Sequence, residues 1–440
     1  MSATIGFISL GCAKNQVDCE QMMFLLRQAG YRISAEPVDV DLVIINTCGF
    51  IDAAKSEAID HIIQAGQNKE AGLVGKILVT GCLAQRYQQE ILTELPEVDG
   101  VLGTGSYYDV VDAVRQVLDG RTVQQYGSIH TPTREVGRIL TTPAHYAYIK
   151  IAEGCDNCCA FCVIPRLRGR FRSRAMEDVV REAEELAANG VKELIVVAQD
   201  TSRYGIDRYG QRMLPQLLRR LCRIEGLHWI RVHYTYPDEI TDELMEVFAT
   251  EPKLVKYLDI PIQHVNDEIL RRMNRRGSKA YLEELFDKLR ARIPGLVIRT
   301  SLIAGLPGEG EAEFEELCDF LRRYKLERVG AFAFSPEEGT AAARMDYPDE
   351  SVAQARADFI GRLQSDVIDA YNESRFDTVM EVLTEDYDGV YYYGRTYADS
   401  PGIDGTVRFT SEREPELGTF VQVRILGAED GDLIGKEEEA

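Results

Sequence analysis

The sequence has 440 residues, of which 45% are hydrophobic, and a formal net charge of −22. This length exceeds one ordinary hydrophobic core and predicts two or three domains, and the composition excludes a chain that is disordered throughout. The opening residues, MSATIGFISLGC, lack the basic and long apolar segments of a signal peptide, and no run is long enough to span a bilayer. We therefore expect a cytoplasmic protein with no membrane contact.

The first part of the chain alternates short apolar runs with helical patterns. The runs cover residues 5–10, 41–46, 76–80 and 98–102, and the helical patterns cover 18–29, 51–65 and 85–94. Continuous apolar runs between helices are typical of a parallel sheet covered on both faces. Residues 1–125 are expected to form this α/β domain.

A second strand–helix series follows a polar connection that contains Pro132 and Pro143. Its candidate strands are residues 147–151, 193–198, 229–232, 255–259, 297–302 and 328–334, which predicts a full or partial (βα) barrel over residues 141–370. Residues 371–440 differ, with short strand patterns at 379–384, 389–395, 405–409 and 419–426. They predict a small antiparallel β-barrel, followed by a disordered acidic tail at 437–439.

Three of the ten cysteines follow the first strand of the second series with a specific spacing. The segment GCDNCCAFCVIP places Cys155, Cys159 and Cys162 in a CxxxCxxC pattern within one loop. Three thiolates from a loop can hold a cubane iron–sulfur cluster and leave one iron open. A zinc knuckle is the alternative, although structural zinc takes four closed ligands and no matching second pair lies nearby. Cys158 adds a complication, because it could pack inertly, compete as a ligand or oxidise.

Three more cysteines stand just beyond three candidate strands of the first domain. Cys12, Cys48 and Cys82 end the segments IGFISLGC, DLVIINTC and KILVTGC. The carboxyl ends of parallel strands share one edge, so these side chains can converge there. Adjacent glycines, Gly11 and Gly81 among them, permit a close approach of the backbone. Buried thiols at sheet ends are an equally good interpretation of these residues alone.

The sequence also contains two charge patterns. Arginines alternate along the chain after the CxxxCxxC loop, at positions 166, 168, 170, 172 and 174. Such a run is ordinarily a solvated surface, although it could neutralise clustered negative charge. Residues 371–440 contain 17 acidic and 6 basic side chains, a net charge of −11.

The chain resembles the methylthiotransferase family of radical S-adenosylmethionine (SAM) enzymes. The resemblance runs in order through SLGCAKNQVDCE, INTCGFIDAAKSEAID, VTGCLAQRY, GCDNCCAFCVIPRLRGRFRSR, VAQDTSRYG, YLDIPIQHVNDEILRRMNRRG, RTSLIAGLPGEGEAEFEEL and VGAFAFSPEEGT. It implies an N-terminal methylthiotransferase domain, a radical SAM barrel and a C-terminal TRAM domain. Three of these segments, INTCGFIDAAKSEAID, LDIPIQHVND and AFSPEEGT, resemble the RimO type, which modifies a ribosomal protein.

The resemblance also implies cofactors and ligands. Cys155, Cys159 and Cys162 would hold a 4Fe-4S cluster whose open iron binds SAM, and a 5′-deoxyadenosyl radical would arise there. Cys12, Cys48 and Cys82 would hold a second 4Fe-4S cluster that carries the sulfur to be transferred. The substrate would be the β-carbon of an aspartate in ribosomal protein S-twelve, and a reductant such as flavodoxin or ferredoxin would supply electrons.

Four further residues are candidate SAM or substrate contacts. Gln199 and Gln263 follow barrel strands, where barrel enzymes gather their active sites. Gly305 and Pro307 form a turn after another strand, in the region that approaches SAM in radical SAM proteins. Ordinary hydrogen bonding at loop starts is an equally good interpretation of the two glutamines.

The acidic C-terminal region bears on the partner. TRAM domains are regarded as RNA-binding folds, and this one has the aromatic residues Tyr391, Tyr392, Tyr393, Tyr397 and Phe409 but a net charge of −11. A basic ribosomal protein suits that charge better than tRNA does, unless the acidity serves only solubility. Two alternatives stay open: the same chemistry on a tRNA adenosine, and a non-enzymatic iron–sulfur or zinc protein bound to the ribosome.

Overall fold

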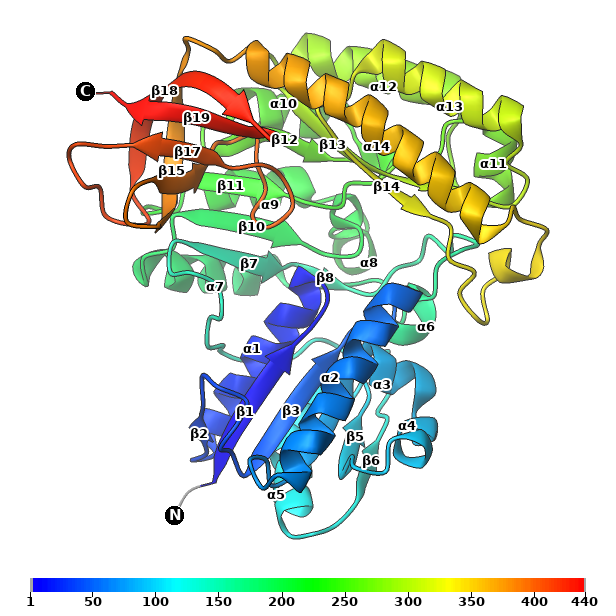
Figure 1. Cartoon of the computed structure of the whole chain (residues 1–440), viewed down its shortest axis with the longest axis vertical. Helices are drawn as coiled ribbons and strands as arrows, with labels where there is room; N and C mark the ends of the chain where they lie inside the picture. The colour runs from blue at the N-terminus through cyan, green and yellow to red at the C-terminus, as the bar shows by residue number, and fades with distance from the viewer. Residues whose placement is uncertain (1–2, 439–440) are drawn as a thin grey trace.

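A computed structural model describes residues 3–438 and shows three parts in chain order (Figure 1). The first part is a parallel sheet with the strand order β2-β1-β3-β4-β5-β6. Its strands are β1 (Thr4–Ser9), β2 (Arg32–Ile33), β3 (Leu42–Thr47), β4 (Ile77–Gly81), β5 (Gly100–Leu102) and β6 (Val123–Gln125). Its helices are α1 (Ala13–Gln28), α2 (Asp52–Glu70), α3 (Cys82–Tyr87), α4 (Gln89–Glu94) and α5 (Val110–Leu118). The predicted α/β fold is confirmed, and the short strands β2 and β6 are additions to it.

Alternate side chains of the buried strands explain why helices cover both faces. Leu42 and Ile44 of β3 pack in one apolar cluster with α1 and α5. Val43 and Ile45, which point the opposite way, pack in a second cluster with α2 and α3. Because side chains alternate across a strand, a continuous apolar run can only be buried between two helical layers.

The central part is an open parallel sheet with the order β14-β13-β12-β11-β10-β7, so it is a partial barrel. Its strands are β7 (Tyr146–Lys150), β10 (Glu193–Val197), β11 (Trp229–Val232), β12 (Leu254–Asp259), β13 (Val297–Ala304) and β14 (Arg328–Ala333). The helices between them are α7 (Met176–Ala188), α8 (Ile206–Tyr209), α9 (Leu214–Cys222), α10 (Asp242–Thr250), α11 (Asp267–Arg272), α12 (Lys279–Arg292) and α13 (Glu311–Tyr324). A small hairpin of β8 (Ala152–Glu153) and β9 (Arg172–Ser173), with helix α6 (Ile164–Arg168) between its strands, was not predicted.

The C-terminal part is a closed barrel with the order β15-β16-β17-β19-β18. Its strands are β15 (Val379–Tyr387), β16 (Tyr392–Arg395), β17 (Val407–Thr410), β18 (Phe420–Glu429) and β19 (Asp432–Glu437). The predicted acidic tail was wrong for Glu437, which ends β19, and residue 439 lies outside the described part. Strand β19 pairs in parallel with β17, so the barrel is not wholly antiparallel. Helix α14 (Glu350–Glu373) leads into the barrel, so the expected boundary at residue 370 falls inside this helix.

The small barrel packs against the amino ends of the central strands. Trp229, at the start of β11, lies edge-on to Phe420 of β18 with ring centroids 4.7 Å apart. Arg395 is 2% exposed and donates to Glu193 Oε2, at the start of β10, at 2.6 Å. In Figure 1, β7 and β10 point away from the small barrel, so the carboxyl ends of the strands lie at the opposite edge.

The buried Arg395–Glu193 contact gives a stability prediction. Replacing Arg395 with Met should lower the free energy of unfolding by about 3–5 kcal/mol, because a buried carboxylate loses a partner. Thermal unfolding and limited proteolysis before Val379 would measure the loss. Arg413→Met is the matched control, because Arg413 pairs with Glu437 while half-exposed, and about 1 kcal/mol or less is expected. Equal effects of the two substitutions would contradict the prediction.

Candidate functional site

The first cysteine triad lies at the carboxyl ends of three neighbouring strands. Cys12 follows β1 and caps α1, Cys48 follows β3, and Cys82 follows β4 as the first residue of α3. These strands pair side by side in register, so the structure brings the three cysteines to one edge. In Figure 1 the arrowheads of β1 and β3 point at the central part.

The glycines beside this triad have a steric role. A Cβ on Gly11, which has φ +88°, would lie 2.7 Å from the Cβ of Cys48. A Cβ on Gly49 would lie 2.8 Å from the backbone nitrogen of Leu83. Because the three loops are this close, only glycine fits at these positions.

Burial and neighbouring charges give the three thiols different pKa values. Burial raises the pKa of Cys82 to about 11, and the neighbouring Cys12 and Cys48 add to the rise. Burial also raises the pKa of Cys48. Burial of Cys12 acts in the same direction, but the positive charges of Lys14 and Arg168 outweigh it and lower the pKa of Cys12. The thiolate that binds metals is therefore favoured at Cys12.

The second triad lies in the loop that connects β8 to α6. Burial raises the pKa of Cys155 to about 12 and also raises the pKa of Cys162, and the charge of Cys159 contributes to both. Cys159 Sγ lies 3.6 Å from the Tyr236 hydroxyl and 3.6 Å from Arg275 Nη1. The predicted loop thus brings its three cysteines together beyond β7 and β8.

Cys158 differs from its three neighbours. Its side chain is exposed, whereas Cys155, Cys159 and Cys162 are half-buried. Its φ is +51°, and its carbonyl accepts a hydrogen bond of 2.9 Å from Asn274 Nδ2. The left-handed backbone separates Cys158 from the other thiols, which supports Cys159 as the third member of the triad.

Arg168 joins the two triads. It lies six residues beyond Cys162, is 3% exposed, and donates through Nε to Cys82 Sγ at 3.3 Å. Its Nη2 donates to Asn15 Oδ1 at 2.9 Å, and its Nη1 binds Asp18 and Glu153. The interpretation of the arginine run as solvated surface was therefore wrong at Arg168, and also at Arg174, which is 6% exposed.

Lys150, at the end of β7, belongs to the same group of buried side chains. We call this group the junction, and it consists of Asn15, Asp18, Lys150, Glu153 and Arg168. Its ammonium binds Asp18 and lies 2.8 Å from Glu153 Oε2. Burial alone would raise the pKa of Glu153, but Lys150 and Arg168 hold it far below its ordinary value. Glu153 Oε1 also accepts a hydrogen bond of 2.9 Å from Gln199 Nε2, so the network reaches the mouth of the barrel.

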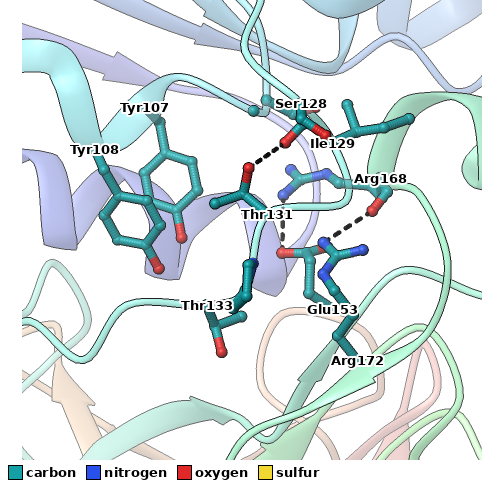
Figure 2. A pocket seen from close by; sticks show the side chains of 12 residues that line it. Tyr107, Tyr108, Ser128, Ile129, Thr131, Thr133, Glu153, Arg168 and Arg172 are labelled. Carbon is teal, nitrogen blue, oxygen red and sulfur yellow. Dashed lines mark hydrogen bonds and ion pairs between the residues drawn. The ribbon is translucent and has the colours of Figure 1, made fainter. Parts of the chain in front are cut away.

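A small pocket opens beside the junction. Figure 2 shows Tyr107 and Tyr108 on one side and Glu153, Arg168 and Arg172 on the other. The connection expected between the first two domains also lines the pocket, through residues 128, 129 and 131–133. This connecting segment therefore packs against the junction and is not a solvated linker there.

Both triads suit iron–sulfur clusters better than single metal ions. Each offers three thiols, and among the described residues no further Cys, His, Asp or Glu completes a single-ion site there, which would suit a cubane with one open iron. Within residues 3–438, no three Cys, His, Asp or Glu side chains are placed to hold one metal ion. The glycines around Cys48 and the cations Lys14 and Arg168 supply the space and the positive charge that a cluster of thiolates requires.

Comparisons with known proteins agree with the three parts of the fold. The model of the Radical SAM superfamily matches residues 149–321, that of the uncharacterized protein family UPF0004 matches 4–103, and that of the TRAM domain matches 378–437. The "Ribosomal protein uS12 methylthiotransferase RimO" of Thermoanaerobacter sp. (strain X514) is 48% identical over 98% of this chain and 99% of its own. That of Pelotomaculum thermopropionicum is 49% identical over 99% of each chain. The chain belongs to the RimO family of methylthiotransferases.

Solved structures show the same fold at low identity. The radical S-adenosylmethionine methyltransferase TsrM from Kitasatospora setae, with cobalamin and a [4Fe-4S] cluster bound, has a TM-score of 0.57 at 16% identity. It covers 78% of this chain and 77% of its own. The cobalamin-dependent S-adenosylmethionine radical enzyme OxsB, with aqua-cobalamin and S-adenosylmethionine bound, has a TM-score of 0.52 at 12% identity and covers 83% of this chain and 56% of its own.

The four predicted SAM or substrate contacts fall at the mouth of the partial barrel or beside it. Gln199 follows β10, and its Oε1 is buried without a partner among the described residues. Gln263 has φ +72° and exchanges backbone hydrogen bonds with Ser301 and Ile303 of β13, both 2.9 Å long. Gly305 donates its N–H to Glu309 Oε1 at 2.9 Å, and Pro307 is buried. Of the four, Gln199 is the one with a buried side-chain acceptor that lacks a partner among the described residues.

Several side chains at the site could not be predicted from the sequence. Lys14, Arg168 and Arg275 are each buried beside a cysteine triad, yet each stands in a polar stretch that reads as ordinary surface. Tyr236 contacts Cys159 from a loop after β11, far away in sequence. A lysine two residues after Cys12 was the one available hint, because a cation near a thiol favours the thiolate.

Metal-free, reduced protein should show the charge difference between Cys12 and Cys82. The lowered pKa of Cys12 means that its alkylation rate should level off at lower pH than an ordinary thiol, whose pKa is about 8.5. The rate at Cys82, with a pKa of about 11, should still rise at pH 9.5. Peptide mass spectrometry after brief iodoacetamide treatment from pH 7 to 9.5 would measure both profiles. Identical profiles for the two thiols would contradict the assigned charge effects.

Proposed function

We propose that the protein is a radical SAM methylthiotransferase that acts on ribosomal protein S-twelve. It would replace a hydrogen on the β-carbon of an aspartate with a methylthio group, using two 4Fe-4S clusters and SAM. The names of full-length relatives at 43–49% identity support this substrate, and the alternatives of tRNA modification and a non-enzymatic metal protein are not favoured. The observation that carries the proposal is the meeting of two cysteine triads at one interdomain junction.

The six cysteines are assigned as cluster ligands. Cys155, Cys159 and Cys162 would hold the cluster that binds SAM, and Cys12, Cys48 and Cys82 would hold the second. When bound, the two clusters and SAM would supply the electron, the hydrogen-abstracting radical, the sulfur and the methyl group. Three thiolates from each triad would leave one iron of each cluster without a cysteine ligand, so each cluster could take a small-molecule ligand there.

The protein's own groups would position these cofactors. Arg168 binds Cys82 from the second domain and fixes the two triads relative to each other. Glu153 holds the amide nitrogen of Gln199, which leaves Gln199 Oε1 to accept a hydrogen bond from SAM. Gln263, Gly305 and Pro307 would shape the same mouth through their backbone. These are contacts that bind and orient, while the cofactors carry the electrons.

No helix within residues 3–438 is long and apolar enough to cross a membrane. We place the enzyme in the cytoplasm, where a flavodoxin or ferredoxin would reduce it. The domains would be residues 1–125, 141–370 and 371–440, and the acidic third domain would attract the basic substrate protein at a point remote from the modified aspartate.

A competition assay tests the substrate. Anaerobically reconstituted enzyme with SAM, sulfide and reductant would receive ribosomal protein S-twelve and bulk tRNA together. Mass spectrometry should find a methylthio group on one aspartate peptide of S-twelve and none on tRNA adenosine. The reverse pattern would keep the chemistry and overturn the proposed substrate.

Substitution of single cysteines tests the ligand assignments. Cys155→Ala and Cys159→Ala should abolish the cleavage of SAM to 5′-deoxyadenosine, at least a hundredfold, because the radical cluster loses a ligand. Cys12→Ala should lose about half of the bound iron and all methylthio transfer but still cleave SAM. Cys158→Ser, the exposed neighbour, is the matched control and should keep all three readouts. Full methylthio transfer by Cys12→Ala would overturn the role of the first triad.

A further inference from the structure

The side chain of Lys14 is a buried cation where the first domain meets the central one. It is the second residue of α1, two positions after Cys12, and it is 8% exposed. Its ammonium lies 3.5 Å from the centroid of the Tyr234 ring. Tyr234 stands two residues beyond β11, at the mouth of the central partial barrel.

Lys14 differs from Lys150 and Arg168 in having no carboxylate partner. Lys150 and Arg168 both bind Asp18 and Glu153. Within residues 3–438, no carboxylate lies within 4.0 Å of the Lys14 ammonium. A buried charge costs free energy unless opposite charge joins it, so this position favours an anionic ligand in addition to the Cys12 thiolate beside it.

The residues around Lys14 place that ligand between the two triads. On one side, Lys14 follows Cys12 in the turn that begins α1. On the other, Tyr234 is held by its N–H, which donates to Asp259 Oδ2 at 3.1 Å, and by its carbonyl, which accepts from the Thr201 N–H at 3.0 Å. Two residues further along the same segment, the Tyr236 hydroxyl lies 3.6 Å from Cys159 Sγ.

We propose that Lys14, backed by the Tyr234 ring, binds the side-chain carboxylate of the substrate aspartate. This inference rests on the proposed function and names the residue that selects its substrate. The carbon to be modified is bonded directly to that carboxylate. An ion pair at Lys14 therefore holds the carbon between the two triads, within reach of both. An asparagine at the same place would leave the ammonium without its counterion.

A charge-balancing role for Lys14 has to be distinguished from carboxylate binding. The ammonium is also close enough to Cys12 to lower the pKa of that thiol, so it could serve only to balance the charge of a cluster. A charge-balancing lysine would affect bound iron and would be indifferent to the substrate side chain. A carboxylate anchor would distinguish aspartate from asparagine.

The test measures peptide binding to reconstituted holoenzyme, with peptides of S-twelve that carry either the target aspartate or an asparagine. Wild-type enzyme should bind the aspartate peptide about tenfold more tightly, which corresponds to ~1.4 kcal/mol. Lys14→Met, which keeps the length without the charge, should lose this preference and raise the KM for the aspartate peptide at least tenfold. Lys14→Arg should keep most of the preference.

Lys288→Met is the matched control, because Lys288 is a half-exposed lysine on α12 that pairs with Asp242. It should leave the preference for aspartate unchanged. An undiminished preference in Lys14→Met would overturn the proposal, and so would an equal loss of affinity for both peptides together with a loss of iron. If wild-type enzyme prefers the aspartate peptide but never methylthiolates it, the proposed function fails while the anchor stands.

Discussion

The structure depends on a buried group of two cations and two carboxylates: Lys150, Arg168, Asp18 and Glu153. Asp18 comes from the first domain, and the other three come from the central one. Burying four charges is expensive, and only full mutual pairing makes the arrangement tolerable. The fork of Arg168 reaches Asp18, Glu153 and Asn15 and still leaves Nε for Cys82. Lysine could not make that set of contacts, because it lacks the planar fork.

This group of charges also fixes how the triads face each other. Arg168 follows Cys162 by six residues through one short helix, and its guanidinium contacts a cysteine of the other triad. The placement of the Cys82 loop relative to the CxxxCxxC loop thus depends on one side chain and on the short helix α6. A domain contact made of apolar surface alone would tolerate sliding, whereas directional hydrogen bonds to two carboxylates and one thiol permit one arrangement.

The sequence was sufficient for the parts of the site that depend on local pattern. Apolar runs that end in cysteine located Cys12, Cys48 and Cys82 at one sheet edge, because parallel strands share their carboxyl ends. The CxxxCxxC spacing located the second triad within a loop. The short strands β2, β6 and β8 were missed because two or three residues show no periodicity, and β19 because its acidic end resembled a tail.

Contacts between domains were beyond the reach of sequence patterns. Arg168 and Arg174 alternate with exposed arginines, and nothing in that run distinguishes a buried guanidinium from a solvated one. The aromatic residues of the C-terminal region were similarly ambiguous. Tyr392 and Phe409 are 6% and 0% exposed and pack in the barrel core, so they cannot stack on a nucleic-acid base. Burial of this kind depends on which surfaces meet, and a single sequence does not encode that locally.

The two ends of the central strands constrain what the substrate can be. The acidic barrel covers the amino ends, where Asp399 pairs with Arg328 at 2.7 Å and Tyr257 donates to Asp404 at 2.7 Å. These two carboxylates face the central domain, so the surface of the barrel is less acidic than its net charge of −11 indicates. The cysteine triads lie at the opposite edge, with the length of the central strands between them and the barrel. A small molecule cannot bridge that separation. A substrate held at the cysteine triads would therefore contact the barrel only if it were large enough to span the length of the central strands.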